Sequence, residues 1–160
     1  MRQGRGILRV VAVVFALATA VPSTGPARAE WDFGLRGGYY TDAEELFLGL
    51  ELLTQVSDTV WWFNPNVEFV FVDPGDLWTL NLDFHYDFDT RDRDTYIWAG
   101  GGPAIVFSDR GGRFDDDETD AGLNLLAGLG WQLESIVPYI QGKILLSDDS
   151  EAVLALGVRF

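Results

Sequence analysis

The 160-residue sequence contains no cysteine, a single histidine and few basic residues. Without cysteine the chain has no disulfide framework and no thiolate zinc site, so backbone ladders and side-chain packing must hold the fold together. Asp and Glu number 25 against 11 Lys and Arg, which gives a formal net charge of -14. Nucleic acid is therefore not an expected partner, because phosphate binding needs the opposite sign.

Long hydrophobic runs are also missing. The apolar run at residues 10–20 falls well short of the ~20 residues that a membrane-spanning helix requires. It follows the basic residues Arg2, Arg5 and Arg9 and precedes the small-residue pattern at 27–29. This arrangement is typical of a secretory signal peptide. We therefore expect residues 1–29 to be cleaved on export and residues 30–160 to form one β domain.

Beyond the leader, aromatic and glycine-rich segments alternate with short polar turns. Apolar residues recur at every second position, which predicts strands with two different faces. Most segments approach the ~9–11 residues of a tilted transmembrane strand. We predict eight of them, at residues 31–40, 45–56, 60–72, 77–88, 95–107, 121–133, 137–147 and 152–160.

The segment at 77–88 shows the alternation most clearly. One face carries Trp78, Leu80, Leu82, Phe84, Tyr86 and Phe88, and the other carries Thr79, Asn81, Asp83, His85 and Asp87. A hairpin centred on Ala43 and Glu44 would pair Leu35 with Leu52 and Arg36 with Glu51. A second hairpin, turning at residues 73–76, would pair Asn66 with Asp83 and Asn64 with His85. Both registers match apolar with apolar and polar with polar residues, as cross-strand pairs require.

Eight antiparallel strands with these faces predict an all-β fold, an up-and-down barrel. An inward apolar face would make a soluble, lipocalin-like periplasmic barrel that binds an apolar ligand. An outward apolar face would make a transmembrane barrel around a filled polar interior. The polar face is not densely charged, because Gly, Asn, Thr and Gln lie between the ionised residues. This low charge density favours the second arrangement. The interior would then hold a structural network of Arg36, Glu51, Glu68, Asp83, His85, Lys143 and Arg159.

Aromatic residues near the strand ends favour the same arrangement, because membrane barrels carry aromatic girdles at both interfaces. We assign to them Trp31, Tyr39, Trp61, Trp62, Trp78, Tyr96, Trp131 and Tyr139. Outer-membrane barrels also have short inner turns and longer outer loops. The strand order places the longest connection, residues 109–120, on the outer side, as this rule predicts.

The last nine residues, AVLALGVRF, resemble the assembly signal of bacterial outer-membrane barrels, which ends in Phe after alternate hydrophobic residues. The signal would comprise Leu154, Leu156, Val158 and Phe160. The segment 121–131 and the pair Pro138-Tyr139 further resemble small opacity-type and OmpA-type barrel domains of the porin-like superfamily. The resemblance implies a Gram-negative cell outer membrane, assembly by the barrel-insertion machinery, and contact with outer-membrane lipid and lipopolysaccharide. We expect a monomer with a structural or surface-interaction role.

Catalysis and cofactors are not expected. His85 and Asp87 invite comparison with lipid-modifying outer-membrane enzymes, which remain an alternative. The serines of the predicted domain, however, lie at turns or strand ends and lack a GxSxG context. The run Asp115, Asp116, Asp117, Glu118 and Asp120 is the candidate calcium site, because calcium prefers several carboxylate oxygens. It lacks EF-hand spacing, so we expect a solvated loop without metal. An eight-stranded barrel is also too narrow for a wide pore.

Overall fold

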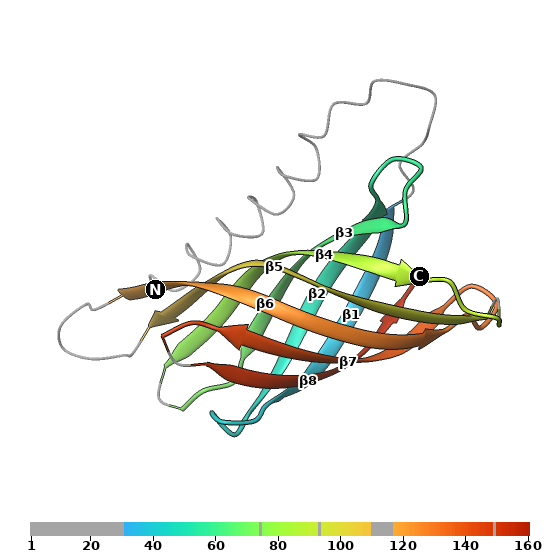
Figure 1. Ribbon diagram of the computed structural model, residues 1–160. Coiled ribbons are helices and arrows are strands. Elements are labelled where there is room, and N and C mark those ends of the chain that lie inside the picture. The colour runs from blue at the N-terminus through green and yellow to red at the C-terminus, as the bar shows by residue number, and fades with distance from the viewer. Residues whose placement is uncertain (1–30, 74, 93, 110–116, 149) are drawn as a thin grey trace.

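The computed structural model describes residues 31–160 except 74, 93, 110–116 and 149. It is a closed antiparallel barrel whose eight strands follow one another in chain order around a common axis (Figure 1). The strands are β1 (Trp31–Tyr40), β2 (Glu45–Gln55), β3 (Trp61–Val70), β4 (Asp76–Phe88), β5 (Thr95–Asp109), β6 (Asp117–Trp131), β7 (Val137–Leu146) and β8 (Glu151–Arg159). The predicted fold class and strand order are confirmed.

The barrel closes where β1 pairs with β8, from Gly34 opposite Arg159 to Tyr40 opposite Val153. Closure leaves no sheet edge exposed, so every strand is hydrogen-bonded on both sides. The C-terminus and the turns that follow β2, β4 and β6 lie at one end, which we call the inner end. The last residues of β1, β3, β5 and β7 lie at the other, the outer end. Among the described residues, no helix has the length and apolar character that crossing a membrane requires.

Both predicted hairpin registers are wrong by two residues. Arg36 lies opposite Gly49 rather than Glu51, and Leu35 lies opposite Leu50. In the second outer hairpin, Asn64 rather than Asn66 lies opposite Asp83. A shift of two residues keeps every side chain on its face, so the predicted faces remain correct although their partners change.

The connection between β5 and β6 is shorter than predicted because both strands extend beyond their expected ends. Each strand has 15 residues, and their pairing continues through Phe107 opposite Thr119. The glycines at 100–102 do not interrupt β5, which keeps one register with β6 throughout. A Cβ atom at Gly100 would overlap the carbonyl oxygen of Phe84. Glycine therefore permits the close approach of β5 to β4.

One inner turn is held by its own side chains. The Asp92 carboxylate accepts hydrogen bonds from the Asp94 N–H and the Thr95 hydroxyl. These bonds favour the charged form, so the pKa of Asp92 lies below its ordinary value. The turn between β4 and β5 thus has the local side-chain support that short connections commonly use.

Large apolar side chains cover the outside of the barrel. Leu48 and Leu156 are each 61% exposed, and Leu125 is 50% exposed. Polar residues of the opposite parity, such as Asn81 and Asn124, are fully buried inside. The structure therefore has the apolar face outward. It contradicts the alternative of a barrel whose lumen is lined by the apolar face.

The predicted aromatic girdles need a correction. Trp61 and Trp131 are exposed near the inner end, and Tyr39 is exposed near the outer end. Tyr139, however, is buried inside the barrel. Trp62 pairs with His85 and shares the inward parity of Asn64. These two rings belong to the lumen side because strand parity, not nearness to a strand end, decides the face.

Candidate functional site

The barrel interior is the part of the described chain where charged and polar side chains gather. All seven residues predicted for the internal network are buried there. Three cationic side chains and three carboxylates balance within it, in addition to His85. The buried polar and charged residues are Arg36, Glu51, Thr54, Asn64, Asn66, Glu68, Thr79, Asn81, Asp83, His85, Asn124, Gln141, Lys143 and Arg159.

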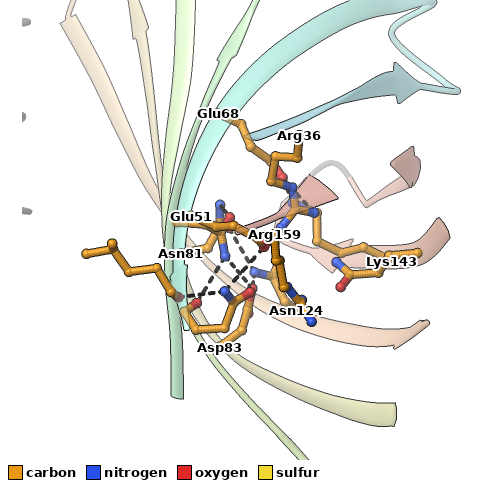
Figure 2. Close-up of polar contacts among 12 residues, drawn as sticks. Arg36, Glu51, Glu68, Asn81, Asp83, Asn124, Lys143 and Arg159 are labelled. Atoms are coloured by element: carbon orange, nitrogen blue, oxygen red, sulfur yellow. Dashed lines mark hydrogen bonds and ion pairs between the residues drawn. The ribbon is translucent and has the colours of Figure 1, made fainter. Parts of the chain in front are cut away.

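Glu68 on β3 is the centre of the ion network. Lys143 Nζ donates a 2.7 Å hydrogen bond to Glu68 Oε2, and the Tyr40 hydroxyl donates to the same oxygen at 2.5 Å. Arg36 Nη2 lies 3.2 Å from Glu68 Oε1 in an ion-pair contact without hydrogen-bond geometry. Glu68 thus joins β3 to β1 and, across the lumen, to β7 (Figure 2).

Glu51 on β2 forms a second ion cluster that shares Arg36 with the first. Arg159 Nε donates a 2.8 Å hydrogen bond to Glu51 Oε1, and Arg36 Nη1 lies 3.6 Å from Glu51 Oε2. Asn64 Nδ2 also donates to Glu51 Oε2 at 3.3 Å. Because Arg36 contacts both carboxylates, the two clusters form one continuous network.

Amides extend this network around Asp83. Asn66 and Asn124 donate hydrogen bonds of 2.9 and 2.8 Å to its two oxygens. Asn124 also donates to Asn81, which donates in turn to Asn66. Figure 2 shows Asn81 and Asp83 of β4 and Asn124 of β6 converging inside the wall. Since β5 lies between β4 and β6, the bonds from Asn124 tie together strands that are not neighbours.

Among the described residues, no hydrogen bond joins the His85 side chain to either ion cluster. Its Nε2 atom is 3.5 Å from Asp87 Oδ1, and its ring lies 5.7 Å from the Trp98 ring. The described serines lie at turns or near strand ends: Ser57, Ser108, Ser135, Ser147 and Ser150. In the described structure, the neighbours of the His85 ring are therefore the Asp87 carboxylate and the Trp98 ring.

Trp98 and Tyr139 fill the interior near the inner end. Trp98 was not singled out from the sequence, and Tyr139 was assigned to a girdle. The Arg159 guanidinium lies 4.8 Å from the Trp98 ring centre and 4.6 Å from that of Tyr139. A Cβ atom at Gly128 would overlap the Trp98 ring, and one at Gly157 would overlap the Tyr139 ring. Glycine on an inward face was the signal available, because it marks where a neighbour's large side chain must fit.

The outer end of the interior is apolar rather than polar. Its cluster, which we call the outer plug, contains Tyr40, Phe47, Val70, Ala104, Leu145, Val153 and Ala155. The predicted polar interior is therefore bounded by a hydrophobic layer. Tyr40 connects the two, because its ring packs edge-on against Phe47 while its hydroxyl reaches Glu68.

The candidate calcium run is only partly described. Asp115 and Asp116 lie outside the described residues, as does the side chain of Asp117. Glu118 and Asp120 lie on β6 rather than in the predicted loop. No group of His, Asp and Glu suited to a metal occurs among the residues searched, which are those the structure describes.

Comparisons with known proteins rest on structure alone. No family profile matches the sequence, and no curated protein matches it. The β-barrel domain of OprF from Pseudomonas aeruginosa superposes with a TM-score of 0.69 at 16% identity, over 81% of this chain and 95% of that domain. Ail from Yersinia pestis, solved with the heparin analogue sucrose octasulfate, has a TM-score of 0.60 at 14% identity, over 84% of this chain and 100% of Ail.

Neisserial surface protein A also has a TM-score of 0.60, at 17% identity, over 83% of this chain and 98% of that protein. All three are small outer-membrane barrels with eight strands. Identities this low establish the architecture only. The chain therefore has the closed eight-stranded fold that these outer-membrane proteins share.

Proposed function

We propose that this protein is an integral outer-membrane barrel with a structural or surface-interaction role, closed to general diffusion and without enzymatic activity. The observation that carries the proposal is the division between its surfaces, with leucines exposed outside and a charge-balanced network buried inside. Such a surface is unfavourable in water but suits hydrocarbon. Export with removal of residues 1–29 belongs to the same proposal.

The closed lumen is supported by bonds that cross it. Lys143 reaches Glu68 from β7 to β3, and Arg159 reaches Glu51 from β8 to β2. The outer plug adds an apolar layer above these ions. An eight-stranded barrel encloses only enough space for side chains, so we infer a stabilised wall rather than a channel.

Reconstitution tests both membrane insertion and closure. The full chain should fractionate with outer membranes and show heat-modifiable migration on gels. In planar bilayers it should give no conductance steps on the scale of a general-diffusion porin that is reconstituted in parallel. Recovery of the folded monomer in detergent-free buffer would contradict the membrane assignment. Porin-like steps would instead contradict only the closed lumen.

Surface interaction at the outer end would differ from that of one structural neighbour. Ail was solved with a sulfated heparin analogue, whereas acidic residues gather at the outer ends of these strands. Those that are described are Asp42, Glu44, Glu45, Asp73, Asp76, Glu118, Asp120, Asp148 and Glu151. Like charges repel, so the described part of this end is not suited to polyanions and favours cationic partners.

The C-terminal residues are proposed to act as a signal for outer-membrane assembly, in addition to their packing in the barrel. The Phe160 side chain is 56% exposed, while its backbone N–H donates to the Phe33 carbonyl oxygen at 2.9 Å. We expect Phe160→Ala to reduce outer-membrane insertion in cells, because the alternating signal of Leu154, Leu156, Val158 and Phe160 loses its aromatic end.

The same variant keeps the backbone hydrogen bond, so its unfolding midpoint after refolding in detergent should stay close to that of the native chain. Phe88→Ala, an exposed phenylalanine at the inner end of β4, is the matched control for loss of a ring. Equal insertion of the native chain and Phe160→Ala would contradict the assembly role.

A further inference from the structure

A blind pocket of about 270 Å³ opens at the outer end of the barrel. We call it the vestibule. Its lower wall is mainly apolar, with Val70, Val106 and Leu145, and the polar Thr79 lies beside them. Serines and carboxylates complete the upper wall. The described residues that line it also include Tyr40, Ala43, Val72, Asp76, Leu77, Ser108, Asp120, Ser147 and Glu151.

The vestibule has a closed floor. Tyr40, Val70 and Leu145 belong both to its lining and to the outer plug. Beneath them, Glu68 accepts the Tyr40 hydroxyl at 2.5 Å and the Thr79 hydroxyl at 3.4 Å. Glu68 is already paired with Lys143 and Arg36. A ligand that enters the vestibule therefore meets an apolar surface, and the ion network below is not open to it.

The described part of the upper wall carries charge of one sign. Asp76, Asp120 and Glu151 contribute carboxylates from β4, β6 and β8, and one Glu151 oxygen accepts the Asp42 N–H at 3.2 Å. Within the described part of the chain, no lysine, arginine or histidine lines the vestibule. Field lines concentrate in such an anionic cleft with apolar walls, which raises the local concentration of cations.

We propose that the vestibule binds a small organic cation with an apolar body, an arylalkyl- or alkylammonium ion. The apolar body would rest on Val70, Val106 and Leu145, and the ammonium group would lie among the carboxylates of Asp76, Asp120 and Glu151. The volume is slightly below the usual range for small-molecule sites, about 300–1,000 Å³, so the ligand is small. The inference rests on the proposed function only for the direction in which the vestibule opens.

Calorimetric titration of the full chain in lipid nanodiscs tests the proposal, with empty nanodiscs as the blank. The first probe is phenethylammonium, for which we expect saturable binding at one site. Ethylammonium lacks the ring, and phenylpropionate replaces the cation with an anion. Each should bind at least about tenfold more weakly, because each loses one of the two complementary features.

Two test variants and one matched control place the site. Asp76→Asn with Asp120→Asn should weaken phenethylammonium binding at least about tenfold. Asp58→Asn with Asp89→Asn makes the same charge change at exposed positions of the inner turns and should leave the affinity unchanged. Ser108→Trp keeps every carboxylate but fills the vestibule, so it should abolish binding. Heat-modifiable migration shows that each variant has folded.

Equal affinities for phenethylammonium and ethylammonium would overturn the role of the apolar floor. Equal affinity for phenylpropionate, or no loss in the Asp76 and Asp120 variant, would overturn the charge recognition. Both probe comparisons use the native chain, so they decide the matter even if a variant fails to fold. Lack of binding by a chain that is folded in the nanodisc would reject this inference while leaving the proposed membrane barrel intact.

Discussion

Replacing Glu68 with glutamine is expected to lower the free energy of unfolding by about 3–5 kcal/mol, the cost of breaking a buried ion pair from one side. The substitution preserves the shape of the side chain but removes its charge. Lys143 and Arg36 would then remain buried without the carboxylate that they share. Urea unfolding of the refolded chain in lipid vesicles, followed by tryptophan fluorescence, measures the loss.

A double substitution distinguishes the effect of leaving the Lys143 charge unpaired from a general loss of packing. Glu68→Gln combined with Lys143→Met removes both partners of the 2.7 Å contact and should recover part of the stability lost in the single variant. Glu134→Gln makes the same chemical change at an exposed inner turn and should have almost no effect. If Glu68→Gln unfolds at the same urea concentration as the native chain, Glu68 does not organise the interior.

An arginine on the lipid-facing surface of the barrel should lower the free energy of unfolding, and the loss should be greater nearer the middle of the bilayer. Leu50 lies in the middle of β2 and is 46% exposed on the outside. Leu50→Arg is expected to destabilise the barrel by about 2–4 kcal/mol in vesicles, because it puts a charge near the middle of the hydrocarbon. The same unfolding assay measures this difference.

Leu46 provides the matched control. It lies on the same strand and the same face, is 62% exposed, and is next to the outer end of β2. Leu46→Arg should cost only about 0–1 kcal/mol, because charge is tolerated near the membrane interface. Equal penalties at Leu46 and Leu50 would contradict a bilayer around this wall. No penalty at Leu50 would contradict hydrocarbon contact altogether.

The alternation of residue types was enough to predict the strands and their faces. In β4, Trp78, Leu80 and Leu82 are separated by Thr79, Asn81 and Asp83, and the polar set is the buried one. An inward polar face was predicted from small amides between the ions, and Asn66, Asn81 and Asn124 do surround Asp83. The residue types along a single strand were sufficient for these predictions, because side chains of a strand alternate between its two faces.

Alternation could not set the registers. Pairing Arg36 with Glu51 or with Gly49 leaves every residue on the same face, since the two registers differ by two positions. The turn decides between them. Glu44 adopts a positive φ of 59° in the first outer turn, and Gly75 adopts one of 128° in the second. Turn geometry of this kind could not be predicted from the hydrophobic pattern.

The sequence by itself determined strands with one apolar and one polar face, because that outcome needs only the period of two. The small polar residues between the ions and the aromatic strand ends then favoured the apolar face outward. Tertiary structure alone decided that Glu68 meets Lys143, that Asn124 reaches Asp83 and that Tyr139 lies beside Arg159. These contacts join strands far apart in the chain or depend on inward space left by Gly157. They follow from strand tilt and stagger around the closed barrel, which all eight registers set together.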